Sequence, residues 1–337
     1  MVDCGAIAAA LLALNAQGGT DYACKASPAG LAVARDADQA NHYLAALDSG
    51  HAAFVAQFGE TPGPAAIIQG NQARAALAGP LEAAGYGRVL PWVDAVEEAQ
   101  RRRDRIRAQI EDQAPGLPEA QLNALVERAL GGQGATDEPL DPAVEQAAIA
   151  HELGHLWYID AFWPDDRDAP AHYGGHAPDW LDEMAAVAME EGPLLETRRE
   201  QLRDADGETP IALDAFLAME HPLASLGQAA RANLADRNNS ADTAASGGMQ
   251  VLRLSGEEAD EFLSQAAIDP GSYYVMARGF LDYLTARAGA APLGELSTWM
   301  RGGGTMETWL AEHGAAHGLP SNTDLLVADW QVWLDGA

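Results

Sequence analysis

Two histidines four residues apart, His151 and His155, place a strong constraint on how this chain folds. The segment 151–155 reads His-Glu-Leu-Gly-His. Residues four apart lie on one face of an α-helix, so both imidazoles can reach one ion if this segment is helical. Glu152 follows the first histidine and can act on a water molecule at that ion. This spacing is the two-histidine zinc signature, and it predicts a zinc site carried by a helix.

The flanking residues predict the bounds of that helix. Asp141 suits the N-cap, and Pro142 suits the first helical position. Pro164 cannot continue a helix, so it marks the end. The helical spacing places the following residues on one stripe: Val144, Ala147, Ala148, His151 and His155.

A second segment carries a resemblance to a known family. Residues 180–185 read Trp-Leu-Asp-Glu-Met-Ala. This segment is similar to the second metal helix of the gluzincin zinc metallopeptidases, which are related to thermolysin and the zinc aminopeptidases. The resemblance implies that Glu183 is the third ligand and that the chain binds one Zn²⁺ ion with His151, His155 and Glu183.

Other side chains near this segment remain alternative third ligands. They are Asp182, Asp179, and the histidines of the intervening loop, His172 and His176. The metzincin branch fits poorly, because its pattern needs glycine at 158 and histidine at 161, where this chain has Tyr158 and Ala161.

Residues 273–285 resemble the helix that follows in peptidase-MA-like proteins, where a tyrosine opens the helix. The resemblance implies that Tyr274 donates its hydroxyl to the oxyanion of the reaction, with Tyr273 as the alternative. Two C-terminal segments, 302–310 and 330–334, resemble the helical end of such domains. The resemblance therefore covers roughly residues 141–337.

One position departs from the thermolysin pattern. Thermolysin-like proteins place an aspartate four residues after the ligand glutamate, and this chain has Val187 there. Metal-binding histidines need a partner for the second ring nitrogen. The candidates that the sequence offers are Glu190, Glu191 and Asp160.

The pattern of apolar residues predicts a mostly helical α+β fold in two parts. We expect residues 1–131 to form a small N-terminal α/β layer with a helical hairpin at 94–131, and residues 132–337 to form a mostly helical part. The resemblance implies that this second part is the helical zinc-peptidase domain. We expect strands at 30–34, 65–68 and 88–93 and helices at 36–58 and 72–84. The glycines at 131–134 mark the boundary, and the polar segment 232–248 is expected to be a loop.

Charge limits the partners that the chain can have. The formal net charge is −30, which disfavours binding to a nucleic-acid backbone. The basic run at 101–107 is interpreted as a solvated helix face that pairs with acidic neighbours. The apolar run at 6–14 is too short to span a membrane. The resemblance implies a peptide or protein substrate, whereas the sequence does not indicate an oligomeric state.

The cysteines, Cys4 and Cys24, flank a predicted helix and a glycine turn. This spacing permits a disulfide, and two partly buried thiols are the alternative. A disulfide would indicate an oxidising compartment, so we expect an extracytoplasmic protein, either periplasmic or secreted.

These features together predict zinc-dependent hydrolysis of peptide bonds, with Glu152 as general base. An endopeptidase is favoured because the chain lacks the Gly-x-Met-x-Asn signature of zinc aminopeptidases. A non-peptidase zinc amidohydrolase and a zinc-binding protein without turnover are the alternatives. Glu152 disfavours the last of these, because a purely structural zinc site needs no general base.

Overall fold

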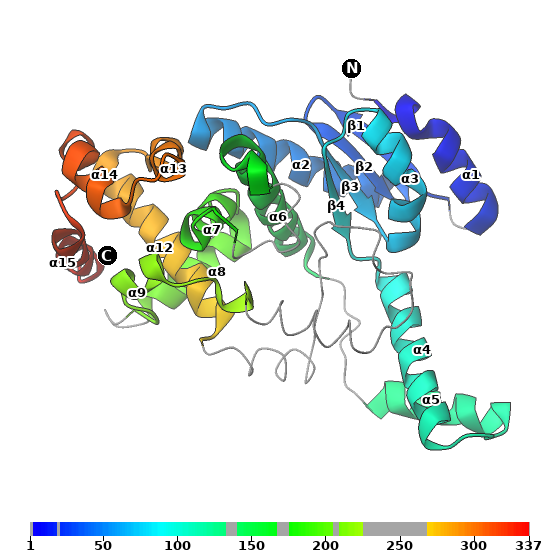
Figure 1. Ribbon diagram of the computed structural model, residues 1–337. Coiled ribbons are helices and arrows are strands. Elements are labelled where there is room, and N and C mark those ends of the chain that lie inside the picture. The colour runs from blue at the N-terminus through cyan, green and yellow to red at the C-terminus, as the bar shows by residue number, and fades with distance from the viewer. Residues whose placement is uncertain are drawn as a thin grey trace.

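The computed structural model describes residues 3–18, 21–132, 140–166, 175–204, 209–224 and 268–336. In these ranges the chain is mostly helical and carries one small sheet, so the predicted α+β class is confirmed (Figure 1). The predicted loop at 232–248 lies outside the described residues, as do residues 133 and 134 of the glycine-rich boundary segment. Gly131 and Gly132 were expected to break the chain, but they are the last two residues of a helix.

The sheet has four strands in the order β1 (Ala23–Ser27), β2 (Gly30–Ala34), β3 (Ala65–Gln69) and β4 (Arg88–Trp92). Strands β1 and β2 form an antiparallel hairpin, whereas β2, β3 and β4 are parallel. The parallel connections pass through α2 (Ala37–Phe58) and α3 (Asn71–Ala83). The three predicted strands are confirmed. Strand β1 was not predicted, because its Ala-Cys-Lys-Ala-Ser sequence lacks strong strand formers and is only partly buried.

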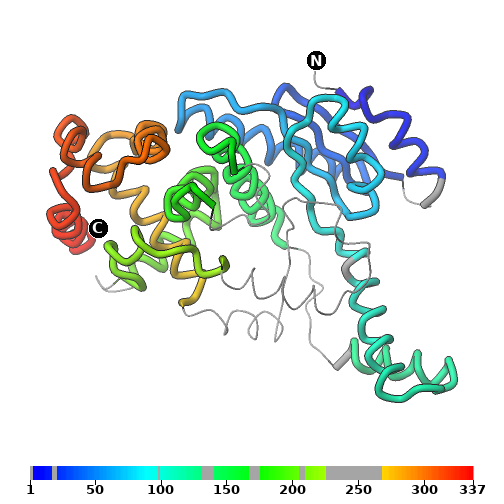
Figure 2. Tube along the Cα trace, in the orientation of Figure 1, coloured from blue at the N-terminus to red at the C-terminus, as the bar shows by residue number. Residues whose placement is uncertain are grey.

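Helices cover both faces of the sheet (Figure 2). One face packs against α3 and α1 (Ala8–Gly18), and its core includes Leu31, Val33 and Ile68. The other face packs against α2, and its core includes Ala32 and Ile67. Successive strand residues therefore enter different cores, as the twofold period of a strand requires.

A helical hairpin, α4 (Ala95–Gln113) and α5 (Glu119–Gly132), extends away from the sheet (Figure 1). Leu122 and Val126 are its buried apolar contacts. Arg107 pairs with Glu111 and Glu119. Such pairing agrees with the interpretation of the basic run as a solvated helix face, in which acids on the same hairpin balance the arginines.

The remaining helices form the second part of the molecule. They are α6 (Pro142–Phe162), α7 (Asp179–Val187), α8 (Gly192–Arg203), α9 (Leu213–Ala218), α12 (Pro270–Ala288), α13 (Leu293–Arg301), α14 (Met306–His313) and α15 (Thr323–Leu334), with short 3-10 turns at Cys4–Ile7, Pro164–Asp166 and Gly314–His317. The Asp141 side chain caps α6 as predicted, and Pro142 is the first residue of that helix. Asp269 caps α12, so Tyr273 and Tyr274 are the fourth and fifth residues of that helix and neither opens it.

Helix α6 connects the sheet to the helical part. Its Trp157 is fully buried against Phe54 and His51 of α2, with ring centroids 5.9 Å apart in each pair. One continuous apolar core includes residues of α2, α6, α7 and α12. Helix α6 therefore packs against the helix that covers one face of the sheet. The proposed division between residues 131 and 132 stays a prediction. None of the described helices is long and apolar enough to cross a membrane.

Cys4 and Cys24 form a disulfide, which ties the first turn of the chain to β1. We predict that the unreduced protein is about 2 Da lighter than the reduced protein, the mass of two thiol hydrogens. Closure of a loop with a sequence separation of 20 residues should stabilise the fold by about 3 kcal/mol relative to the reduced chain. Intact mass spectrometry and denaturant unfolding test both values. Two alkylatable thiols in the unreduced protein would contradict the bridge.

Candidate metal centre

The site forms where α6 and α7 approach each other closely at Gly154. A Cβ atom at this position would lie 2.9 Å from the Cα of Ala186 and 2.9 Å from the Cγ of Met189. Any larger residue would therefore push the two helices apart. Ala186 lies in the last turn of α7, and Glu183 precedes it by three residues on the same helix.

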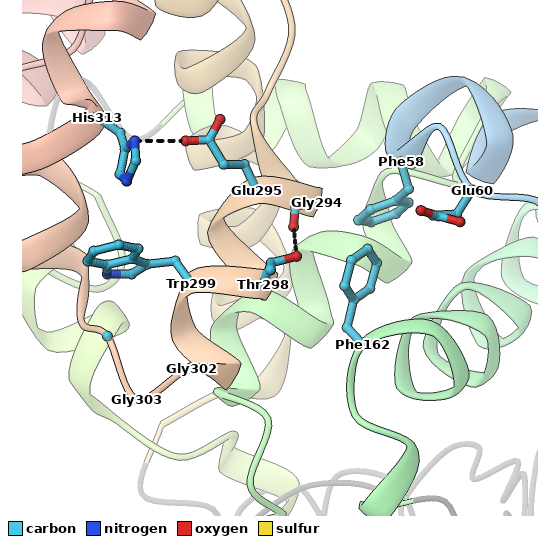
Figure 3. A pocket seen from close by; sticks show the side chains of 11 residues that line it. Phe58, Glu60, Phe162, Gly294, Glu295, Thr298, Trp299, Gly302, Gly303 and His313 are labelled. Atoms are coloured by element: carbon cyan, nitrogen blue, oxygen red, sulfur yellow. Dashed lines mark hydrogen bonds and ion pairs between the residues drawn. The ribbon is translucent and has the colours of Figure 1, made fainter.

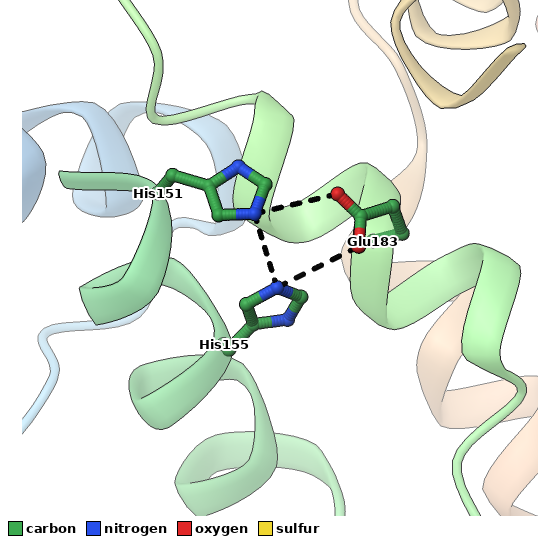
Figure 4. Close-up of side chains that lie close together, drawn as sticks. All are labelled: His151, His155 and Glu183. Carbon is green, nitrogen blue, oxygen red and sulfur yellow. Dashed lines mark hydrogen bonds and ion pairs between the residues drawn. The ribbon is translucent and has the colours of Figure 1, made fainter. Parts of the chain in front are cut away.

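At this contact His151, His155 and Glu183 converge, as Figure 4 shows. The two Nε2 atoms of the histidines are 3.3 Å apart. Oε1 of Glu183 is 3.4 Å from Nε2 of His151, and Oε2 is 3.7 Å from Nε2 of His155. Among the described residues this is the one group of three or more His, Cys, Asp or Glu side chains whose ligand atoms all lie within 4.8 Å of one another.

These distances fit a metal ion in tetrahedral geometry. Two ligand atoms that are each about 2.05 Å from a tetrahedral ion lie about 3.3 Å apart. The distances of 3.3 and 3.4 Å agree with that value, whereas the distance of 3.7 Å from Oε2 of Glu183 to Nε2 of His155 is longer. The three side chains could therefore hold one ion with little rearrangement, and the donor set leaves a fourth position for another ligand.

The three side chains are almost completely buried, with exposed fractions of 7% for His151, 1% for His155 and 0% for Glu183. Burial lowers the pKa of His151, but the carboxylates of Glu183 and Glu190 outweigh it and hold this pKa at about 9. Burial raises the pKa of Glu183 to about 7. Burial and the nearby His151 lower the pKa of His155 well below its usual range.

Two carboxylates orient the histidine rings. Glu190 lies 2.8 Å from Nδ1 of His151, and Asp182 lies 2.9 Å from Nδ1 of His155. When Nδ1 of each ring donates its proton to a carboxylate, the lone pair of Nε2 is available to a metal. Glu190, one of the candidate orienting residues, therefore takes the place of the aspartate that is absent at position 187.

The guanidinium of Arg198 compensates the buried charge of Glu190. Its Nε and Nη2 atoms each donate to a different oxygen of that carboxylate, both at 2.6 Å. Burial raises the pKa of Glu190, but the hydrogen bonds and charges of His151 and Arg198 outweigh it and lower this pKa. The same guanidinium lies 4.6 Å from the ring centroid of Tyr274, within range of a cation–π contact.

The other candidates from the sequence have different positions. Asp182 contacts Nδ1 of His155 and does not belong to the group of three ligands, and Asp160 forms a half-buried ion pair with Arg88. His176 is exposed and hydrogen-bonded to Asp166. Glu191 is exposed at the N-cap of α8. Asp179 accepts a hydrogen bond from the backbone N–H of His221. His172 lies outside the described residues.

Glu152 and Tyr274 both border the histidines. Glu152 is half-buried, and desolvation raises the pKa of its carboxyl group. Tyr274 is also half-buried, and its ring centroid is 5.8 Å from that of His151. Tyr273, the alternative, is fully buried against Phe216 and the ring of His221. The chemical roles of Glu152 and Tyr274 stay predictions.

His221 belongs to this site, although the sequence gave no reason to select it. Its side chain is completely buried, and its Nε2 lies 3.6 Å from Oε2 of Glu183. Its backbone N–H donates to Asp179 at 2.7 Å, and its Nδ1 accepts from the backbone N–H of Leu223 at 3.1 Å. No motif surrounds this histidine, so a tertiary contact alone reveals it.

A separate hollow of about 730 Å³ lies where the ends of α2 and α6 meet α13 and α14 (Figure 3). Phe58, Phe162 and Trp299 contribute aromatic rings, and Glu60, Glu295 and His313 contribute polar groups. None of the residues of the candidate metal centre lines it.

Comparison with known protein families, with curated proteins and with solved structures finds no match.

The contacts to Nδ1 predict how metal affinity depends on the orienting carboxylates. Asp182→Ala removes the partner of His155, so metal affinity should fall about 10- to 100-fold. Asp160→Ala is the matched control, because its carboxylate pairs with Arg88 and should leave metal affinity unchanged. Chelator competition measures both variants, and thermal unfolding checks that each is folded. Equal affinity in Asp182→Ala and the parent would contradict the assignment.

The raised pKa of His151, about 9, predicts that metal uptake releases protons. At pH 7 this imidazole is protonated in the metal-free protein and must become neutral to bind a metal. Uptake at pH 7 should release at least about one proton per ion, and affinity should rise from pH 6 towards pH 9. Calorimetry in buffers of different ionisation enthalpy measures this release. Affinity that does not change over this range would contradict it.

Proposed function

We propose that this protein is a zinc-dependent hydrolase that cleaves peptide bonds as an endopeptidase. The observation that carries the proposal is the arrangement of His151, His155 and Glu183 around one point, with Glu152 next to His151 in the chain and its carboxyl group interacting electrostatically with that imidazole. A structural zinc site is usually closed by four protein ligands, whereas a catalytic site has three and leaves one position open. Three converging side chains with a neighbouring base favour catalysis.

Zinc is the metal that these donors suit best. Two imidazole nitrogens and one carboxylate oxygen are borderline ligands, and the short distances between them suit a small tetrahedral ion. Mg²⁺ and Ca²⁺ prefer oxygen ligands and higher coordination numbers, so they suit this site less well. When bound, zinc polarises the substrate carbonyl and makes a water molecule more acidic.

Glu152 is the residue that we propose moves the proton. Desolvation raises the pKa of this carboxyl group, which makes it a better base than a solvated glutamate. It takes a proton from the attacking water and delivers it to the leaving amine. Tyr274 stands next to His151 and, in this proposal, donates its hydroxyl to the oxyanion. The guanidinium of Arg198 against its ring holds that side chain in place.

The disulfide supports an extracytoplasmic location. Disulfides persist in oxidising compartments and are rare in the reducing cytosol. The bridge between Cys4 and Cys24 therefore leads us to propose that the protein functions in the periplasm or outside the cell.

The proposal predicts that Glu152→Gln still binds zinc but has lost most of its catalytic activity. This variant should retain about one zinc ion per chain, because Glu152 is not a ligand, and it should lose about 10²- to 10⁴-fold in turnover. Tyr274→Phe should lose about 10²- to 10³-fold in turnover, also with its zinc retained. Metal analysis and cleavage of a peptide library, with the product ends sequenced, measure these effects.

His155→Ala is the control for the ligand set, because it should lose most of its zinc as well as its activity. Glu152→Gln cutting peptides as fast as the parent would contradict the proposed base. If the parent binds zinc and cuts small amides but no peptide, the amidohydrolase alternative is correct. If it binds zinc and cuts neither, the protein binds zinc without turnover.

A further inference from the structure

The surroundings of Glu183 include one buried polar group that the proposed reaction does not use. This group is the imidazole of His221, which lies between Glu183 and the rings of Tyr273 and Tyr274. Neither His221 nor Glu183 has an exposed side-chain surface. The imidazole is therefore sealed from a substrate and can act only on its protein neighbours.

The hydrogen bonds of His221 define which ring nitrogen carries the proton. Nδ1 receives the backbone N–H of Leu223 at 3.1 Å, and a backbone N–H can only donate. Nδ1 is therefore the acceptor, and Nε2 of the neutral ring carries the hydrogen. A protonated Nε2 has no lone pair for a metal, so His221 cannot be a fourth ligand in this state. It presents an N–H donor instead.

The ring has little freedom to turn away. Asp179 accepts the backbone N–H of His221 at 2.7 Å, and the backbone oxygen of the same residue accepts from Ala224 at 2.8 Å. The ring centroid is 4.6 Å from that of Tyr273, with the planes close to perpendicular. These contacts hold Nε2 on the side of Glu183 that carries Oε2, at 3.6 Å.

We propose that His221 is a positioning residue for the glutamate ligand, and that its Nε2–H holds Oε2 of Glu183 so that the carboxylate binds the metal through one oxygen. The separation of 3.6 Å is longer than a settled hydrogen bond of about 2.7–3.2 Å, so Nε2 and Oε2 would have to move closer for the hydrogen bond to form with a metal bound. One-oxygen binding leaves the fourth coordination position to water. This inference rests on the proposed metal function and deepens it.

Two amide substitutions test the inference with the full-length protein. The side-chain amide of His221→Gln reaches about as far as Nε2 and keeps a donor near Oε2, whereas that of His221→Asn reaches only about as far as Nδ1. His221→Leu removes the donor altogether. Removal of such an outer partner typically lowers metal affinity about 10- to 100-fold. We expect this loss in the Asn and Leu variants and recovery of most of it in the Gln variant.

Chelator competition with Zn²⁺ measures the affinities, and thermal unfolding of the metal-free proteins checks the fold. The visible absorption of the Co²⁺-loaded proteins reports coordination number, because four-coordinate cobalt absorbs more strongly than five-coordinate cobalt. The parent and the Gln variant should give the stronger spectrum, and the Asn variant the weaker one. A role in packing alone would not produce this difference between two polar side chains.

Equal zinc affinity and equal cobalt spectra in the Gln and Asn variants would overturn the positioning role. Parental affinity in a folded Leu variant would overturn it as well. If the Leu variant does not fold, the comparison of Gln with Asn still decides the question. Failure of the parent itself to bind zinc would instead refute the proposed metal function, and with it the basis of this inference.

Discussion

The close contact between α6 and α7 at Gly154 is the constraint on which the candidate site depends. Without a side chain at this position, the backbone of α7 comes near enough for Glu183 to face both histidines. A Cβ atom would meet the Cα of Ala186 at 2.9 Å, and backbone atoms cannot move aside as the end of a side chain can. Since a metal site tolerates errors of only a few tenths of an ångström in ligand distance, small changes in helix separation matter here more than elsewhere.

Helix α7 carries three buried acids, Asp179, Asp182 and Glu183, in only nine residues. Burial of a carboxylate costs several kcal/mol unless hydrogen bonds or opposite charges compensate it. Each acid has a different role. Asp179 accepts a hydrogen bond from the backbone of His221, Asp182 contacts the ring of His155, and Glu183 is one of the three converging ligands. Without these contacts, burial of the three carboxylates would destabilise the helix. The contacts compensate that cost, and through them the acids position other groups.

Local sequence rules explain the parts of the structure that were predicted correctly. The cap at Asp141, the four-residue spacing of the histidines and the apolar runs of β2 and β3 are encoded by near neighbours in the chain. The resemblance placed Glu183 at the histidines. The orienting contacts join residues that are 39 positions apart, for Glu190 with His151, and 27 apart, for Asp182 with His155. Such partners depend on how helices pack, so single-sequence patterns could offer Glu190 only as one of three candidates and gave no sign of His221.

The position of Arg198 makes the two sides of the site energetically interdependent. Its guanidinium binds Glu190, which orients a proposed metal ligand, and it also lies on the ring of the proposed oxyanion donor Tyr274. Residues that share one network commonly show interaction energies of about 0.5–3 kcal/mol. The effects of substitutions at Glu190 and Tyr274 should therefore not add. A substitution that changes the metal side of the site would therefore also change the environment of Tyr274, because both contact Arg198.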